Sequence, residues 1–281
     1  MIIVADSGST CTDWVIIENK QIIHTIKTKG FNPYFTKSEE IYDELKLKFP
    51  KNINLNKIDT IYFYGAGCSS EEMNLIIYKG LNPFFKSSKI EIEHDLLAAA
   101  RALFQNEAGI AVILGTGSNT CYYDGQSIVK NITSLGFILG DEGGGDYLGK
   151  LFIQSYLNNE LPTEINEAFL NQYKLTTNQI LQAVYKEEYP NRFLASFTKF
   201  ILDYEDNSAI SKIITRCFSD LFSKHICKYD NYRNLKIRFT GSISHYFKNP
   251  LNDVANTFGT RIDLIEKEPI SLLTQYHMNN S

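Results

Sequence analysis

The sequence predicts an α/β protein of two lobes built on one plan, and three observations lead to this prediction. Short apolar runs alternate with stretches of helical periodicity along the 281 residues. The apolar run at Ile2–Ala5 leads into a turn rich in Gly, Ser and Thr, and the run at 110–114 does the same. Aligned without gaps, Val4–Ser9 falls over Ile113–Ser118, so the opening of the chain is repeated. No Pro/Ser-rich or low-complexity linker interrupts the chain, which favours a tight hinge between the lobes.

The elements follow from periodicity and turn residues. Very short breaks between the first three apolar runs favour an antiparallel meander over a βαβ unit. Ser38 is the expected N-cap of the first helix, with Glu39 and Glu40 in its first turn. The expected strands are 2–5, 14–17, 21–27, 60–64, 90–93, 110–114, 236–240 and 261–265; the expected helices are 38–48, 70–81, 95–104, 147–157 and 270–276, within a mostly helical region at 143–234.

Composition excludes several classes of function. The 28 Lys and Arg residues are nearly balanced by 32 Asp and Glu, so nothing marks a nucleic-acid or anionic-membrane surface. No run of about 18 apolar residues and no signal peptide is seen, which predicts a cytoplasmic protein. The five cysteines form no CxxC pair, so neither a zinc site nor an iron–sulfur cluster is indicated.

The first candidate site is the turn Asp6-Ser7-Gly8-Ser9-Thr10. Small residues let backbone N–H groups approach phosphate oxygens, and the Asp6 carboxylate would sit where Mg²⁺ and its waters are held. The alternative is an ordinary tight hairpin with an acidic turn.

Two further small-residue turns share this chemistry. Gly115-Thr116-Gly117-Ser118-Asn119 ends a buried strand and could hold a phosphate or a sugar hydroxyl. Gly241-Ser242 lies between a strand and a helix and could offer helix N-terminal amides to a nucleotide, or be a generic β–α turn.

A carboxylate at the end of a strand carries the predicted catalysis. Asp95 follows His94 after the strand 90–93, where it could accept a proton from a substrate hydroxyl. It is equally suited to cap the helix that begins there, and both roles can hold at once.

The segment 136–146, Gly-Phe-Ile-Leu-Gly-Asp-Glu-Gly-Gly-Gly-Asp, is the most specific in the chain. Its glycines allow close backbone approach, and Asp141 and Glu142 could bind sugar hydroxyls or an ammonium group. A surface loop with solvated acids is the alternative. Asn32, in an Asn–Pro turn at 30–35, is a further candidate ligand contact.

In this order, the motifs resemble those of the N-acetylglucosamine kinase family, which belongs to the superfamily of actin, heat-shock chaperones and sugar kinases. The resemblance spans residues 1 to about 275, and GTGSN with GDEG are its most specific parts. It implies two ribonuclease H-like lobes, each a mixed five-stranded sheet flanked by helices, with ATP in a cleft between them. The implied lobes are 1–109, completed by a C-terminal helix at 268–281, and 110–267. The segment 136–140 is shorter than in the animal enzymes and lacks their Trp and His.

The resemblance implies an ATP-dependent kinase acting on an amino-sugar such as N-acetylglucosamine or N-acetylmuramic acid, with the 6-OH as expected acceptor. It assigns Asp95 as the base and Asp6 to Mg²⁺; it leaves a homodimer open. The implied ATP contacts are Ser7, Gly8, Ser9, Thr10, Thr116, Gly117, Gly241 and Ser242, and the implied sugar contacts are Asn32, Ser118, Asn119, Gly136 and Asp141. Two alternatives are an ATPase that activates a 2-hydroxyacyl-CoA dehydratase and a sugar sensor without catalysis.

Overall fold

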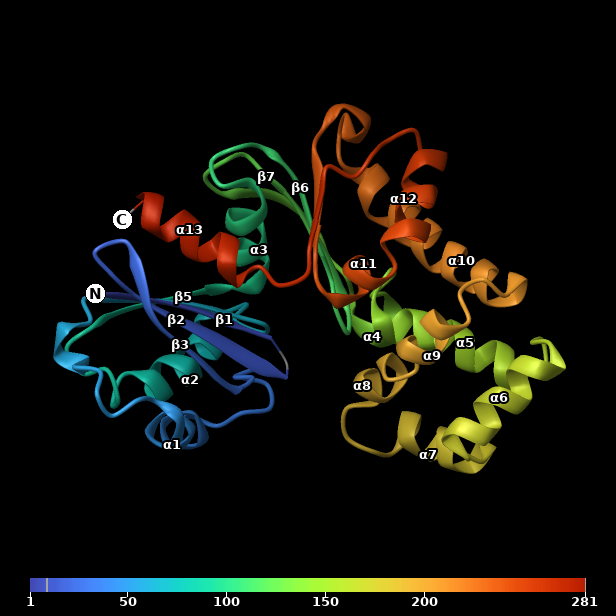
Figure 1. The fold of residues 1–281 in the computed structure, drawn as a ribbon, viewed down its shortest axis with the longest axis horizontal. Coiled ribbons are helices and arrows are strands. Elements are labelled where there is room, and N and C mark those ends of the chain that lie inside the picture. The colour runs from blue at the N-terminus through green and yellow to red at the C-terminus, as the bar shows by residue number, and fades with distance from the viewer. Residues whose placement is uncertain (9, 281) are drawn as a thin grey trace. The chain divides into compact units, whose positions relative to one another are not determined.

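The chain folds into two compact units, seen in a computed structural model that describes residues 1–8 and 10–280 (Figure 1). Unit 1 comprises residues 1–107, a short piece at 125–128 and the C-terminal segment from Glu268. Unit 2 comprises 108–124 and 129–267.

The sheet of unit 1 has five strands in the order β3-β2-β1-β4-β5. These are β1 (Ile2–Ser7), β2 (Cys11–Glu18), β3 (Gln21–Lys29), β4 (Thr60–Gly65) and β5 (Lys89–His94). The first three form an antiparallel meander, as the short breaks predict, whereas β4 and β5 run parallel to β1. The carboxyl ends of β1, β4 and β5 therefore meet at one edge of the sheet.

Helices cover both faces of this sheet, and each face has its own core (Figure 1). One core joins Trp14 and Phe63 of the strands to α1 (Ser38–Lys48) and α2 (Glu71–Leu81). The other core joins Val4 and Val15 to α3 (Asp95–Phe104) and α13 (Ile270–Asn280). This division follows from the period of two along a strand, which sends neighbouring side chains to opposite faces. The remaining element is a 3₁₀ turn, η1 (Leu55–Lys57).

The sheet of unit 2 repeats this plan with the order β10-β9-β6-β7-β8. Its strands are β6 (Gly109–Leu114), β7 (Ser118–Tyr123), β8 (Ile128–Ile132), β9 (Ile237–Thr240) and β10 (Leu264–Glu266). β6 and β7 are antiparallel, while β9 is parallel to β6 and β10 to β9. The predicted fold class of two mixed five-stranded sheets flanked by helices is confirmed.

Between β8 and β9 the chain is helical, as its periodicity predicts. α5 and α10 pack against the sheet through a large core in which Phe152, Phe200 and Phe218 are fully buried. The helices of unit 2 are α4 (Gly136–Leu139), α5 (Gly145–Leu157), α6 (Thr163–Tyr173), α7 (Thr177–Tyr185), α8 (Pro190–Ala195), α9 (Thr198–Asp203), α10 (Ser208–Lys224), α11 (Ser242–Tyr246) and α12 (Lys248–Thr257), with the 3₁₀ turns η2 (Ile226–Lys228) and η3 (Tyr232–Asn234).

The predicted cap of α1 is wrong, and the reason is a tertiary hydrogen bond. Lys37 occupies the N-cap position, and its backbone N–H donates to Glu40 Oε2 at 3.0 Å. The Ser38 hydroxyl instead donates to the carbonyl of Ile76 at 2.8 Å, which ties α1 to α2. Across residues 1–8 and 10–280, no helix combines the length and the apolar character needed to cross a membrane.

Candidate functional site

The carboxyl-end edge of the sheet in unit 1 gathers the predicted residues of that unit. Ser7 pairs with Gly65 across β1 and β4, and Gly65 pairs with His94 across β4 and β5. Asp6 is one residue short of the end of β1, and Asp95 is the first residue of α3. The strand register thus places these two carboxylates at the same edge.

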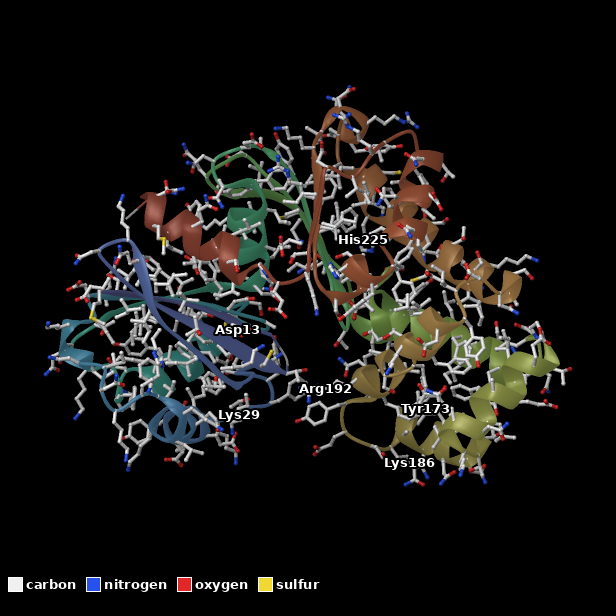
Figure 2. All side chains as sticks on the ribbon, in the orientation of Figure 1. Asp13, Lys29, Tyr173, Lys186, Arg192 and His225 are labelled. Carbon is white, nitrogen blue, oxygen red and sulfur yellow. The ribbon has the colours of Figure 1, made fainter. Side chains whose placement is uncertain are left out.

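The carboxylates at this edge interact electrostatically. Burial raises the pKa of Asp6 to about 7, and the negative charges of Asp95, Asp13 and Glu268 add to the effect in that order. Asp13 lies directly opposite Asp6 across β1 and β2, and Figure 2 labels it on that sheet. A cation would relieve this repulsion, and carboxylate oxygens with waters are what Mg²⁺ prefers. Within residues 1–8 and 10–280 no three His, Cys, Asp or Glu side chains gather closely enough to hold a metal by themselves, so a metal here would keep most of its waters.

The end of β5 places His94 and Asp95 in contact. Nδ1 of His94 lies 2.7 Å from Oδ1 of Asp95, whose side chain is 27% exposed. Burial alone would lower the pKa of His94, but its hydrogen bond to Asp95 and the charge of that carboxylate raise it. The N-cap of α3 is His94 rather than Asp95: Nδ1 of the neutral ring accepts the Leu96 N–H at 3.0 Å, and the same nitrogen donates to Asp95 only when the ring is protonated. Asp95 is therefore not the N-cap of α3, and the alternative prediction that it caps this helix is wrong.

In the first small-residue turn, the residues differ in what they can offer a ligand. Ser7 is fully buried; its hydroxyl lies 2.7 Å from that of Thr12 and accepts the Phe31 N–H at 2.9 Å. Gly8 N–H donates to the Cys11 carbonyl at 3.0 Å, and Gly8 and Thr10 are exposed. Ser9, also predicted to contact phosphate, lies outside the described residues. The Ser7 hydroxyl thus shapes the turn, while Thr10 presents its side chain to solvent.

Asn32 lies close to the loop that follows β4. Its Oδ1 accepts the Tyr34 N–H at 3.0 Å, so its amide NH₂ is the group it can offer to a ligand. A Cβ at Gly67, whose φ is +85°, would lie 2.6 Å from Asn32 Oδ1. Gly67 is thus a position where the approach of Asn32 excludes a side chain, and the pattern Gly65-Ala66-Gly67 at a strand end is the sequence signal for it.

In unit 2, the second small-residue turn is held against the Gly-rich segment. Backbone N–H groups of Gly145 and Asp146 donate to the carbonyls of Gly115 and Thr116 at 2.9 and 2.8 Å. The Ser118 N–H donates to Asp141 Oδ1 at 3.3 Å. A Cβ at position 117 would lie 2.8 Å from Asp141 Oδ2, so a larger residue there would displace that carboxylate. The structure therefore brings Thr116, Gly117, Ser118 and Asp141 together.

Asp141 forms a buried carboxyl pair with Asp146. Burial raises the pKa of both groups, and the charge of Asp141 raises that of Asp146 further. The backbone N–H of Tyr147 donates to Asp146 Oδ1 at 2.6 Å. A pair of this kind retains a proton that lets one carboxyl donate to the other. Asp146 was seen in the motif but not singled out, because a carboxyl pair depends on a turn whose course the sequence does not give.

Glu142 has a structural partner, which the sequence did not reveal. Its carboxylate is 2.9 Å from Lys224 Nζ and 2.9 Å from His225 Nε2, and Figure 2 labels His225 just after α10. Burial alone would raise the pKa of Glu142, but His225 and Lys224 lower it. Within unit 2 the ammonium group that Glu142 contacts is that of Lys224, and its binding of sugar hydroxyls stays a prediction.

Two side chains of the second turn retain polar groups for a ligand. Asn119 Oδ1 accepts from the Thr120 N–H at 2.9 Å and from Asn131 Nδ2 at 3.0 Å, which leaves its NH₂ to donate. Ser118 Oγ is buried and has no hydrogen-bond partner within residues 1–8 and 10–280. Gly136 begins α4 with φ of +74°, beside the exposed side chains of Leu135 and Ile138.

The turn after β9 borders a cavity of unit 2. Gly241 has φ of +116°, and a Cβ there would lie 2.2 Å from the Leu114 carbonyl oxygen. Ser242, the first residue of α11, lines an open cavity of about 440 Å³ together with Tyr246 and Phe247 of the same segment and Lys199 of α9. The turn residues are thus set by close backbone approach, and the cavity beside them is large enough for a heterocyclic base.

Comparison with known proteins places these features in context. A solved structure from Porphyromonas gingivalis, provisionally named an N-acetylglucosamine kinase, is 38% identical, with a TM-score of 0.94 over 100% of this chain and 99% of that one. A second, from Chromobacterium violaceum with the same provisional name, is 14% identical with a TM-score of 0.76 over 98% of each chain. A ROK-family glucokinase from Streptomyces griseus, solved with glucose and AMPPNP, shares the fold at 12% identity and a TM-score of 0.59 over 99% of this chain and 98% of that one. No protein-family profile and no curated protein matches the chain.

Proposed function

This chain belongs to the N-acetylglucosamine kinase family, and from that premise we propose that it transfers the γ-phosphate of ATP to a hydroxyl of an amino-sugar. The observation that carries the proposal is the carboxylate edge of unit 1, where burial and then the charge of Asp95 raise the pKa of Asp6 beside a turn of small residues. Such an edge suits phosphoryl transfer, which depends on positioning and on charge neutralisation more than on covalent chemistry.

Asp95 is the proposed general base. Its carboxylate would accept the proton of the acceptor hydroxyl while that oxygen attacks the γ-phosphorus and the bond to the β–γ bridging oxygen breaks, releasing ADP. The 27% exposure of its side chain leaves it within reach of a substrate. His94 holds this carboxylate in place through the 2.7 Å contact. The expected acceptor is the 6-OH.

The turn after β1 is the proposed phosphate-binding element. Gly8 offers close backbone approach, and Thr10, with its neighbour Ser9, offers hydroxyl groups to phosphate oxygens. Asp6, once deprotonated, would hold Mg²⁺ through its waters, and the metal when bound would neutralise charge on the β- and γ-phosphates. Thr116 and Gly117 of the second turn are proposed as further phosphate contacts.

The proposed sugar contacts are those with unused polar groups. Asn32 and Asn119 have NH₂ groups to donate, and Ser118 Oγ lacks a partner within the described part of the chain. Asp141 would accept from a sugar hydroxyl, with the proton shared with Asp146 setting its charge. Gly136 lies in the segment that leads to Asp141. An N-acetylated sugar supplies both hydroxyl donors and a carbonyl acceptor for this set.

The proposed adenosine contacts are Gly241 and Ser242. Their support is the cavity of about 440 Å³ beside them, with the aromatic side chain of Tyr246 at its wall. A base could stack on such a ring while the turn approaches the sugar-phosphate part of the nucleotide.

The test is ADP release from Mg-ATP with a panel of N-acetylglucosamine, N-acetylmuramic acid, glucosamine, N-acetylmannosamine and glucose. We expect turnover that depends on the sugar and is greatest with one amino-sugar. Asp95→Asn should lower kcat by at least about 100-fold, since a positioned base contributes roughly 10²–10⁴-fold. Glu93→Gln, which removes an exposed carboxylate two residues earlier on β5, is the matched control and should retain turnover.

Two results would contradict the proposal. ATP hydrolysis at the same rate with every sugar and with none would point to an ATPase activator. Binding of sugar and nucleotide in calorimetry without any phosphorylated product would point to a sensor.

A further inference from the structure

Asp146 is a buried acid beside the proposed sugar contact Asp141, and it touches no ligand in the proposed function. It is the second residue of α5 and only 1% exposed, so it does not reach a substrate itself. Its backbone N–H donates to the Thr116 carbonyl at 2.8 Å, while the φ of +57° at Asp141 turns the preceding loop. This course of the chain places the two carboxyl groups within hydrogen-bonding reach of each other.

One oxygen of Asp146 has no donor. Oδ1 accepts the Tyr147 N–H at 2.6 Å, whereas Oδ2 is buried and receives no N–H or O–H from residues 1–8 and 10–280. An ionised carboxylate can only accept, so a charged Asp146 would leave Oδ2 unsatisfied and away from water. A protonated carboxyl has an O–H to donate, and the Asp141 carboxylate beside it is an acceptor. The geometry therefore favours a proton on Asp146.

Asp141 is the better anion of the pair. It receives the Ser118 N–H at 3.3 Å and a second hydrogen bond from the side chain of Ser134. Asp146 has only the Tyr147 N–H, and it is more deeply buried than Asp141. Burial, followed by the charge of Asp141, raises the pKa of Asp146 to about 8. At neutral pH the proton thus stays on Asp146, and Asp141 carries the charge.

The lysine nearest to the pair on the same helix does not replace this proton. Lys150 lies one turn further along α5, and its Nζ donates to the Phe137 carbonyl at 3.0 Å. Burial lowers the pKa of Lys150, and the charge of Asp146 partly offsets that effect. In turn, Lys150 opposes the rise in the pKa of Asp146, but by less than burial or Asp141 promotes it.

The groups on the α10 side of the pair do not neutralise it either. Lys224 and His225, at the end of α10, each lie 2.9 Å from Glu142. The charge of Glu142 adds to the raised pKa of Asp141. Burial raises the pKa of the Cys217 thiol, so this group is uncharged at neutral pH. A second negative charge on the pair would therefore be poorly compensated.

We propose that Asp146 is a positioning residue of the sugar site, which keeps a proton on Oδ2 and donates it to Asp141, so that Asp141 is held as a single carboxylate facing the sugar. The role rests on the proposed function, in which Asp141 accepts from a sugar hydroxyl. When the proton leaves, Asp141 loses a donor and meets a second buried negative charge. Sugar binding should consequently weaken as pH rises through about 8, and binding above that pH should take up a proton.

The test is isothermal titration calorimetry of the full chain with N-acetylglucosamine from pH 7 to pH 9, in buffers of different ionisation enthalpy. Wild-type affinity should fall about tenfold over this range, with uptake of about one proton at pH 9. Asp146→Asn replaces the O–H by an N–H that does not ionise, so its affinity should stay constant without proton uptake. Asp146→Ala lacks any donor and should bind about tenfold more weakly than the wild type at pH 7. Asp230→Asn, at a side chain that is 96% exposed, is the control and should keep the wild-type profile.

The proton can also be measured without a sugar. The infrared spectrum of the wild type at pH 7 should contain the C=O band of a protonated carboxyl group that is missing in Asp146→Asn. A spectrum unchanged by this substitution would overturn the inference even if sugar phosphorylation is normal, as would the same pH dependence of affinity in wild type and Asp146→Asn. If no amino-sugar binds or is phosphorylated, the proposed function fails and the role of Asp146 in sugar binding fails with it, although the infrared band would still locate the proton.

Discussion

Replacing Asp6 with Asn should stabilise the protein at high pH, although it removes the proposed metal-binding group. Burial, with the nearby carboxylates, raises the pKa of Asp6 from 3.8 to about 7, so the folded state binds this proton more tightly than the unfolded chain. The stability that the bound proton gives is complete below about pH 4 and is lost as pH rises through about 7. The two pKa values differ by about three units, and each unit is worth about 1.36 kcal/mol, so the free energy of unfolding changes by roughly 4 kcal/mol. Asn carries no charge, so Asp6→Asn escapes this loss.

The assay is urea unfolding of wild type and Asp6→Asn at intervals between pH 4 and pH 9. We expect the variant to gain stability relative to wild type by up to about 4 kcal/mol across this range, most of it between about pH 4 and pH 7. Mg²⁺ with ATP should narrow the difference, because a bound cation stabilises the ionised carboxylate. Asp43→Asn, an exposed position on α1, is the control and should show no such trend. A stability difference between wild type and Asp6→Asn that is constant with pH would refute the reasoning.

Three further predictions concern close contacts in unit 2. Gly117→Ala should lower the melting temperature and the activity, because its Cβ would lie 2.8 Å from Asp141 Oδ2. Gly115→Ala is the control: a Cβ added at Gly115 would have no atom within 4 Å, so the melting temperature should not change. Gly241→Ala should lower the free energy of unfolding in urea by at least about 2 kcal/mol, since φ is +116° and its Cβ would lie 2.2 Å from the Leu114 carbonyl oxygen. A variant as stable as the wild type would contradict this. Glu142→Gln should lower the free energy of unfolding by roughly 1–3 kcal/mol at pH 7, because it weakens the contacts with Lys224 and His225. Because the pKa of Glu142 is lowered, this difference should shrink as pH falls below about 4, and a difference that grows instead would show that the pairing was misjudged.

Much of the fold could be predicted because its signals are local. The meander of β1 to β3 follows from three apolar runs with short breaks, and the repeat of strand, turn and strand at Gly109–Tyr123 follows from residue similarity. Errors occurred where a tertiary contact competes with a local preference. Ser38 is a good cap by type, but its hydroxyl bonds the Ile76 carbonyl, which is distant in sequence. The strand expected at 261–265 is shorter, at Leu264–Glu266, because Asp263 instead donates its N–H to, and accepts from, Ile237.

The candidate site could be predicted by residue but not by pairing. A carboxylate at the end of a strand is visible in the sequence, and Asp6 and Asp95 were found that way. That the charge of Asp95 adds to the raised pKa of Asp6 depends on the order β1-β4-β5, which places strands from distant parts of the chain side by side.

The motif Gly140-Asp141-Glu142-Gly143 shows how adjacent acids come to have separate tasks. Asp141 adopts φ of +57°, an αL conformation that turns the chain between the two side chains. Its carboxylate therefore faces the Ser118 N–H of the second turn, while that of Glu142 faces Lys224 and His225 at the end of α10. The ion pairs of Glu142 fix the loop to a helix of the core, and this leaves Asp141 in a defined position beside Gly117 and Ser118. Loss of Glu142 should consequently weaken the proposed sugar binding through the position of Asp141, since its carboxylate holds the loop through Lys224 and His225.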